Sequence, residues 1–163
     1  MEGWAYNDEL KRGQADSRKA FMAMKFGDEE LDRVFQKTLK PAMEAVGFDL
    51  FSLAERDRWK AGLIDDRMRV EIQSSAILLT DLTHQNAGAY WEAGYAEGLG
   101  TPVIYTCEKS VFEKQKTHFD TNHHVTIIWD PENLEEAVED LKATVRATLP
   151  DLASAVDLDV EAT

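Results

Sequence analysis

The chain has little cysteine, little proline and no long apolar run: its 163 residues include one cysteine and four prolines. A bilayer-spanning helix needs roughly 20 consecutive apolar residues, and no such segment is present. The single cysteine, Cys107, excludes an intramolecular disulfide and a thiolate metal cage. The first residues, MEGWAYNDELKRG, have neither the apolar centre nor the small-residue cleavage site of an export signal. We therefore expect a cytoplasmic protein that contacts no membrane.

Positive charge is also scarce. The chain has 18 Lys and Arg against 31 Asp and Glu, which gives a formal net charge of −13. Such a protein repels phosphate backbones, and its basic residues are scattered rather than gathered into a stripe. We therefore expect no nucleic acid polymer as a partner. A small anionic ligand is still compatible with this charge, because a helix N-terminus or a single Arg provides local positive potential.

The composition is that of one globular domain. Hydrophobic residues make up 44% of the chain and charged residues 30%, which is usual for a folded domain of this length. We expect a flexible N-terminal arm over residues 1–16, a single domain over residues 17–149, and an acidic C-terminal tail over residues 150–163 that frays.

Short apolar segments alternate with segments of helical spacing. Each apolar segment has the length of a strand and is bounded by polar or turn residues. This alternation predicts an α/β fold, a flavodoxin-like three-layer sandwich with a five-stranded parallel sheet in the order 2-1-3-4-5. The predicted strands are residues 19–27, 48–54, 76–82, 101–107 and 124–130.

Helix signals fill the intervals between the strands. Asp28 is the expected N-cap of the first helix, which Pro41 breaks or kinks before it ends near Gly47. The third helix is expected to begin after the polar cluster that ends with Asn86, and a closing helix to occupy residues 131–149. The second helix is marked by one face, which is formed by Ile64, Met68, Ile72 and Ser75.

A cleft is expected where the strand order reverses, between the first and third strands, because ligands of such sheets bind beyond the carboxyl ends of these strands. The loops 25–28 and 82–88 should face this cleft. Glu92 lies one helical turn beyond the second loop, and Gly88, one turn before it, leaves space for a planar ring or a sugar. A partly desolvated carboxylate there is a nucleophile toward an electron-poor carbon. The alternative for Glu92 is a solvated surface charge.

Three further polar residues near this cleft have two interpretations each. Asp66 lies in the first turn of the second helix, where it either complements the helix dipole or leans toward Glu92. Asp81 ends the third strand and either caps the next turn or contacts a ligand. Asn86 caps the third helix, turns its amide toward the ligand, or does both.

The long segment 108–123 is expected to be a loop, either a lid that brings His118 or Asp120 onto the ligand or a plain solvated loop. Arg56 and Trp59, in the loop after the second strand, either hold a nucleobase or pack at the rim. The histidines lack the helical pairing of zinc or iron ligands, and no P-loop or dinucleotide fingerprint is present. We therefore expect no metal and no cofactor.

The segment DLTHQNAGAYWEAGYAEGLGTPVI, residues 81–104, carries a more specific pattern. It resembles the signature region of the nucleoside 2-deoxyribosyltransferase-like superfamily, in which Asp-Leu-Thr is followed by Asn, by Glu-x-Gly-Tyr-Ala and by Leu-Gly-x-Pro-Val. FMAMKF, LKPAMEAVGF and HFDT are similar to a bacterial branch of this group, related to deoxynucleotide N-hydrolases and TIR-like nucleotide-binding domains. The resemblance covers residues 18–146.

The resemblance implies cleavage of the N-glycosidic bond of a 2′-deoxynucleoside or deoxynucleotide, by a hydrolase or a deoxyribosyltransferase. Glu92 matches the nucleophile of the family, and Asp66 matches an acidic active-site residue that precedes the motif. Asn86 departs from the pattern, because some transferases have an aspartate there. An amide cannot supply a proton as a carboxylic acid does, which argues against efficient base exchange.

Two alternatives use the same fold: a nucleotide-binding sensor without turnover, and a TIR-like NAD hydrolase that uses Glu92 and releases nicotinamide. Enzymes of this group are usually homo-oligomers in which a neighbouring subunit completes the site, so the resemblance also implies a homo-oligomer. The expected ligand is a small nucleoside or nucleotide. The predicted substrate-binding residues are Met24, Phe26, Gly27, Asp81, Asn86, Gly88, His118 and Asp120.

Overall fold

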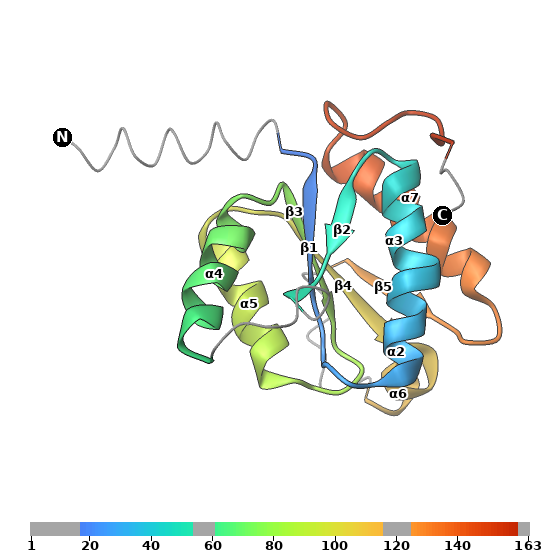
Figure 1. The fold of residues 1–163 in the computed structure, drawn as a ribbon. Helices are drawn as coiled ribbons and strands as arrows, with labels where there is room; N and C mark the ends of the chain where they lie inside the picture. Colours follow the sequence, from blue (N-terminus) through green and yellow to red (C-terminus); the bar gives the residue numbers. More distant parts are fainter. Residues whose placement is uncertain (1–16, 54–60, 116–124, 160–163) are drawn as a thin grey trace.

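The computed structural model describes residues 17–53, 61–115 and 125–159. Its centre is a five-stranded sheet in the order β2-β1-β3-β4-β5, and each neighbouring pair of strands is parallel (Figure 1). The predicted flavodoxin-like α/β arrangement is thus confirmed. The strands are β1 (Lys19–Ala23), β2 (Asp49–Phe51), β3 (Ile77–Asp81), β4 (Val103–Glu108) and β5 (Thr126–Trp129).

Helices cover both faces of the sheet (Figure 1). On one face lie α4 (Ala61–Gln73) and α5 (Ala87–Gly98). On the other face, α7 (Leu134–Thr148) packs against a helical stretch made of α2 (Glu29–Val34), the π-helical η1 (Phe35–Leu39) and α3 (Lys40–Ala45). No helix within the described ranges has both the length and the hydropathy of a membrane span.

Two apolar cores lie between these layers. Successive side chains of a strand point to opposite faces, so Phe21 and Leu78 pack in the core under α4 and α5, whereas Met22 and Leu79 pack in the core under α3 and α7. A sheet covered on both faces is built from continuous apolar runs. This is why the strands were visible in the sequence without alternation of polar and apolar residues.

The first strand is shorter than the apolar segment that predicted it. β1 ends at Ala23, although Met24 is still buried. Phe26 is 52% exposed, and Gly27 has a φ of +76°, a left-handed conformation that favours glycine. The chain therefore turns away from the sheet before the apolar run is finished, and the predicted loop at the carboxyl end of β1 begins earlier than its hydropathy indicates.

The first helical stretch begins as predicted and passes through Pro41. The Oδ1 atom of Asp28 accepts a hydrogen bond from the Leu31 amide at 2.9 Å, which is an N-cap contact. In η1 the Lys40 amide donates to the Phe35 carbonyl, five residues back. Proline in a regular α-helix clashes with the carbonyl four residues before it, and the wider π turn relieves this clash. Helical structure thus continues to Ala45.

Part of the segment predicted as a loop is helical. The short helix α6 (Lys109–Lys114) follows β4 directly, and Glu108 caps it by accepting a hydrogen bond from the Ser110 amide at 3.2 Å. A helix of six residues has no repeating apolar face, so its sequence contains no period to detect. Residues 116–124 lie outside the described residues.

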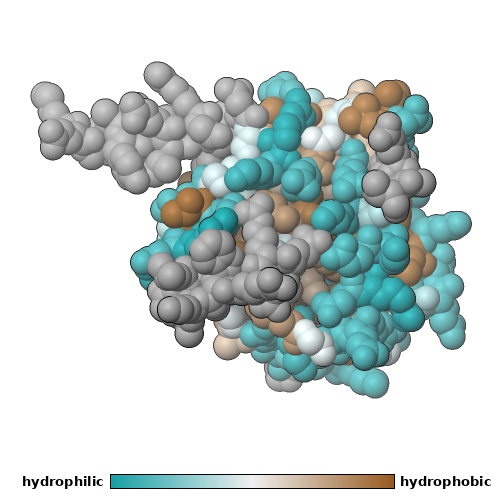
Figure 2. Space-filling model, in the orientation of Figure 1, coloured by the Kyte–Doolittle hydropathy of each residue, from teal (hydrophilic) through white to brown (hydrophobic). Residues whose placement is uncertain are grey.

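The fraying predicted for the C-terminal tail is not seen over residues 150–159, which lie against α3 and α7. The Leu158 amide donates to the Ala45 carbonyl at 2.8 Å. Lys142 is only 7% exposed, and its ammonium donates to Asp157, which also accepts from Arg146. The acidic tail therefore neutralises a nearly buried lysine. Apolar side chains of this segment form a patch beside the hydrophilic outer surface of α3 (Figure 2).

Candidate active site beside Glu92

The loop after β3 ends with the residue that caps α5. Asn86 has an extended backbone, and its Oδ1 atom accepts a hydrogen bond from the Gly88 amide at 3.0 Å, as predicted for the N-cap. A Cβ atom on Gly88 would lie 3.3 Å from this oxygen. Glycine therefore suits the cap geometry. It also leaves α5 without a side chain one helical turn before Glu92.

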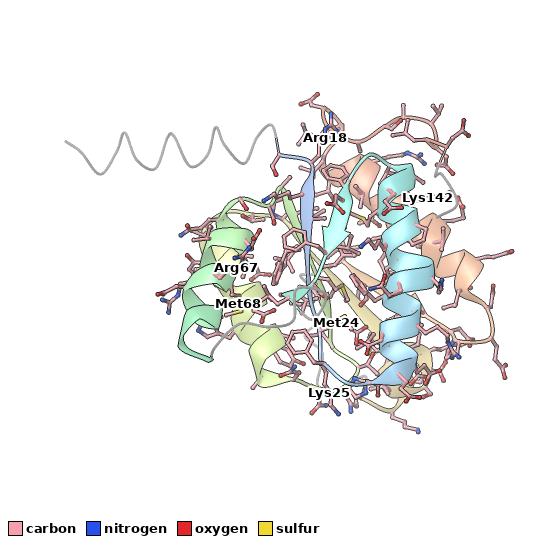
Figure 3. The ribbon with its side chains drawn as sticks, in the orientation of Figure 1. Arg18, Met24, Lys25, Arg67, Met68 and Lys142 are labelled. Carbon is pink, nitrogen blue, oxygen red and sulfur yellow. The ribbon has the colours of Figure 1, made fainter. Side chains whose placement is uncertain are left out.

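Glu92 lines a cleft of about 340 Å³ between α4 and α5. The other lining residues are Met68 and Arg69 of α4 and Gly88 and Trp91 of α5. Figure 3 shows Met68 on the part of α4 that adjoins α5. The side of α5 that packs on the sheet is formed instead by Ala89, Ala93 and Ala96.

The carboxyl group of Glu92 is partly buried and has no hydrogen-bond or ion-pair partner among the described residues. Burial raises the pKa of Glu92 from its usual value to about 7, because the charged form loses solvation. Both the acid and the carboxylate are therefore populated near neutral pH. A poorly solvated carboxylate on the wall of a cleft is suited to attack an electron-poor carbon or to stabilise a developing cation.

The α4 wall of the cleft carries a guanidinium group. The Cζ atom of Arg69 lies 5.7 Å from the centroid of the Trp91 ring, and its Nη1 atom lies 3.5 Å from the Oδ1 atom of Asp66. The Trp91 ring stacks on Tyr95 at 5.4 Å, and the Tyr95 hydroxyl accepts a hydrogen bond from Gln73 at 2.7 Å. These contacts join α4 to α5 along the rim of the cleft.

Asp66, predicted to act together with Glu92, is placed outside the cleft lining. Its side chain is 82% exposed, and the ion pair with Arg69 is its contact within the described residues. The side chains of Ile64 and Asp65 lie outside the described set. Asp66 is thus linked to the cleft through Arg69 rather than by direct access to it.

Asp81 is 2% exposed and fully engaged. Its Oδ1 atom accepts from the Thr83 amide at 3.0 Å, and its Oδ2 atom accepts from the Thr106 hydroxyl at 2.7 Å and from the Trp129 indole at 2.9 Å. Burial raises the pKa of Asp81, and these donors oppose the shift. The structure contains the capping contact that was one of the two interpretations of Asp81. The same side chain also links β3 to β4 and β5.

The loops after β1 and β3 meet, as expected from the strand order. The Nε2 atom of His84 lies 3.0 Å from the Oδ2 atom of Asp28, and the Nδ1 atom of His84 is buried without a hydrogen-bond partner among the described residues. This link was not predicted. Met24, Phe26 and Gly27 lie in the first of these loops and do not line the cleft beside Glu92; Figure 3 shows Met24 at the end of β1.

The structure therefore brings together Glu92 and Gly88 from the predicted set and adds Met68, Arg69 and Trp91. Two of the added residues had a signal in the sequence. Met68 belongs to the periodic face of the second helix, and Trp91 adjoins Glu92. The rotation of α4 relative to α5 decides which side chains face the cleft, and this rotation cannot be read from the sequence. His118, Asp120, Arg56 and Trp59 lie outside the described residues.

A second groove, of about 510 Å³, lies on the opposite face of the sheet, where α3 approaches α7. Its floor is apolar, with Pro41, Ala42 and Val138 among the lining residues. Its lining also holds four charged residues, two of which, Glu139 and Lys142, pair with each other at 2.7 Å. The carboxyl groups that line this groove are exposed, whereas the carboxyl group in the cleft is partly buried and has no partner among the described residues.

No group of three His, Cys, Asp or Glu side chains suited to a metal ion occurs in the described part of the chain. Neither a model of a known protein family nor a curated protein matches the sequence. Function is therefore inferred from the Glu92 cleft and from the motif at residues 81–104.

Proposed function

We propose that the protein cleaves the N-glycosidic bond of a 2′-deoxynucleoside or deoxynucleotide, with Glu92 as the nucleophile. The observation that carries this proposal is the partly buried carboxyl group of Glu92, which has no partner among the described residues and lines a cleft. When the bond between C1′ and the base nitrogen stretches, C1′ develops positive charge. A carboxylate beside C1′ stabilises that charge more strongly than water does, because the site is partly dry.

The reaction balances as two displacements. An oxygen of the Glu92 carboxylate forms a bond to C1′, the bond from C1′ to the base breaks, and its electron pair leaves with the base nitrogen, which takes up a proton from solvent. Water then attacks C1′ of the resulting ester and gives up a proton to solvent, while the bond between C1′ and the Glu92 oxygen breaks, which releases the sugar and restores the carboxylate. If a second base takes the place of water, the same ester leads to a deoxyribosyl transfer.

The size and shape of the cleft support a ligand of this class. Its volume of about 340 Å³ lies toward the lower end of small-molecule sites. Gly88 leaves room for a ring directly before Glu92, and Met68 provides an apolar wall. The resemblance of residues 81–104 to the deoxyribosyltransferase motif supports the same role for Glu92, on grounds independent of the cleft.

The test is a substrate panel followed by chromatography of the released base. Purine and pyrimidine deoxynucleosides, their monophosphates and NAD are each incubated with the wild-type protein, with Glu92→Gln and with Glu97→Gln. Glu97 is a matched control because it lies on α5, is exposed and accepts a hydrogen bond from Tyr105 at 2.8 Å. We expect the wild type and Glu97→Gln to release base from a deoxy substrate and Glu92→Gln to release none.

The same panel separates the alternatives. Release of nicotinamide from NAD, with deoxynucleosides untouched, identifies a TIR-like NAD hydrolase. A rise in melting temperature with a nucleotide, without consumption of any compound, identifies a sensor. Base release that persists in Glu92→Gln excludes Glu92 as the nucleophile.

A further inference from the structure

The proposed reaction leaves one charged group of the cleft without a role. Arg69 is the cationic member of the five lining residues, and its side chain is 49% exposed. It has no hydrogen bond to Glu92, although both side chains line the same cleft. A ligand in this cleft therefore meets a carboxyl group on α5 and a guanidinium on α4 at the same time.

Arg69 is held in position but is poorly neutralised. Its partner Asp66 is 82% exposed, and the two groups are 3.5 Å apart. An exposed pair of this kind is screened by water and contributes little. The Trp91 ring, 5.7 Å from the guanidinium carbon, positions the group without cancelling its charge.

We propose that Arg69 binds a phosphate on the ligand, so that the substrate is a deoxynucleoside monophosphate rather than a free deoxynucleoside. This inference rests on the proposed function. A guanidinium fork matches a phosphate in geometry and forms charge-assisted hydrogen bonds with it. The net charge of −13 disfavours anions overall, so a phosphate is accepted where a local cation compensates, and in this cleft that cation is Arg69.

Asp66 then acts on the ligand through Arg69. Its carboxylate occupies the guanidinium in the free protein, and a phosphate takes its place on binding. Removing the charge of Asp66 should therefore strengthen phosphate binding, whereas an acidic catalytic residue would lose activity when changed. Trp91 is a positioning residue for Arg69, because its ring lies beside the guanidinium.

The experiment compares kcat/KM for a deoxynucleoside, its 5′-monophosphate and its 3′-monophosphate. We expect the wild type to prefer one monophosphate over the nucleoside by about tenfold or more, the effect of one charge-assisted contact. Arg69→Gln should abolish this preference, mainly through KM for the monophosphate. Asp66→Asn should lower KM for the monophosphate and not for the nucleoside.

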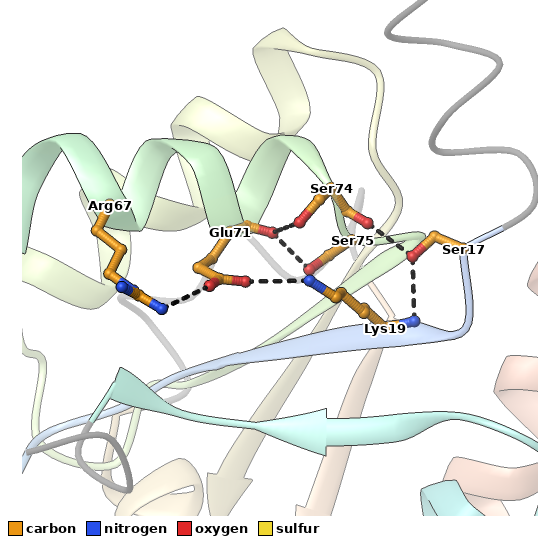
Figure 4. A network of polar contacts seen from close by, with 6 residues as sticks. All are labelled: Ser17, Lys19, Arg67, Glu71, Ser74 and Ser75. Atoms are coloured by element: carbon orange, nitrogen blue, oxygen red, sulfur yellow. Dashed lines mark hydrogen bonds and ion pairs between the residues drawn. The ribbon is translucent and has the colours of Figure 1, made fainter.

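Arg67→Gln is the matched control, because Arg67 lies on the same helix, pairs with Glu71 and does not line the cleft (Figure 4). It should keep the preference for the monophosphate. Inorganic phosphate should inhibit the wild type competitively and inhibit Arg69→Gln much less.

The outcomes distinguish this inference from the proposed function. Equal kcat/KM for nucleoside and both monophosphates, with base release intact, overturns the role of Arg69 and leaves the reaction in place. If no compound is cleaved, the proposed reaction fails, and the anion site is tested by melting temperature alone. A rise with the monophosphate that exceeds the rise with the nucleoside, and is lost in Arg69→Gln, supports the site; equal rises reject it.

Discussion

Glu71 and Glu92 lie on neighbouring helices that cover the same face of the sheet, and their carboxyl groups have opposite surroundings. Glu71 is 6% exposed and lies between two cations: its Oε2 atom is 3.5 Å from Lys19, and its Oε1 atom is 3.7 Å from Arg67. Glu92 is partly buried and has no partner in the described part of the chain. Burial of a carboxylate is therefore not what distinguishes a candidate site; the missing partner is.

The positions of the two glutamates follow from the sheet. Glu71 lies near the end of α4, at the edge where β1 begins, and its carbonyl accepts hydrogen bonds from the Ser74 and Ser75 hydroxyls. Ser17 donates to the Ser74 carbonyl at 2.6 Å and completes this network (Figure 4). Glu92 lies near the start of α5, at the carboxyl edge, where sheets of this kind bind their ligands. One edge is closed by ion pairs and hydrogen bonds, and the other carries a carboxyl group that has no partner in the described part of the chain.

The largest expected effect is on turnover. Glu92→Gln should lower kcat by about a thousandfold or more, because an amide cannot form the glycosyl ester. Glu71→Gln, the matched change on α4, should alter kcat by less than about threefold, since it removes a structural contact. Steady-state rates of base release measure both. A similar loss of kcat in the two variants would mean that the lack of a partner at Glu92 does not mark it as the catalytic residue.

A third buried carboxylate, Asp81, sharpens the comparison because its partners are neutral donors. Asp81→Asn should lower the free energy of unfolding by about 3 kcal/mol, since an amide nitrogen facing the Thr106 or Trp129 donor leaves polar groups unpaired. Urea denaturation followed by circular dichroism measures this change. An unchanged midpoint would show that these hydrogen bonds contribute nothing to stability.

The pH dependence of activity follows from the raised pKa of Glu92. The carboxylate is the nucleophile, and its pKa is about 7. The value of kcat/KM should therefore fall about tenfold per pH unit below pH 7 and level off above it. A profile of kcat/KM between pH 5 and pH 9 tests this. A flat acid limb down to pH 5 would indicate that the reacting group is not Glu92.

The free energy of unfolding should fall as the pH rises, whereas the activity should increase. The pKa of Glu92 is raised from 4.5 to about 7 on folding, so its favourable contribution is complete below pH 4.5 and is lost as the pH rises through 7. Glu92→Gln avoids this loss. The variant should be more stable than the wild type by roughly 3 kcal/mol at pH 8 and nearly equal to it at pH 4.5. Urea titrations at the two pH values measure the difference, and a variant less stable at pH 8 would contradict it.

The smallest effect concerns the partnered glutamate. Glu71→Gln should lower the free energy of unfolding by about 1 kcal/mol, because the side chains of Lys19 and Arg67 are 46% and 36% exposed and water screens both ion pairs. Urea denaturation at pH 7 tests this when it is carried out with and without salt. A salt concentration of about 1 M screens exposed charges. A loss that does not shrink in salt would point to packing rather than charge.

The sheet was predictable because its strands are buried on both faces and are joined by alternating helices. The caps Asp28 and Asn86 were also visible, since their side chains act on the next few residues. The docking of residues 150–159 was not predictable. It depends on Lys142 being nearly buried, and a lysine on a periodic helix is expected to be solvated.

The candidate site was predictable at Glu92 and Gly88, where one helical turn sets the relation between the residues. Arg69 and Trp91 could not be assigned, because they meet across two helices whose relative rotation is set by packing on the sheet. The position of Asp66 relative to the cleft could not be assigned for the same reason. Its place in the sequence is close to the cleft residues of α4, but its side chain is directed to solvent.

The π turn at Phe35–Leu39 gives the first helical stretch one more residue than an unbroken α-helix would hold over the same length. Each residue of an α-helix advances the chain by about 100° around the axis. The wider π turn absorbs this advance for the extra residue, so Ala42 and Met43 face the core as they would in a regular helix that is one residue shorter. A deletion of exposed Gln36 should therefore leave the α3 side chains on the core and remove the room that the π turn gives to Pro41.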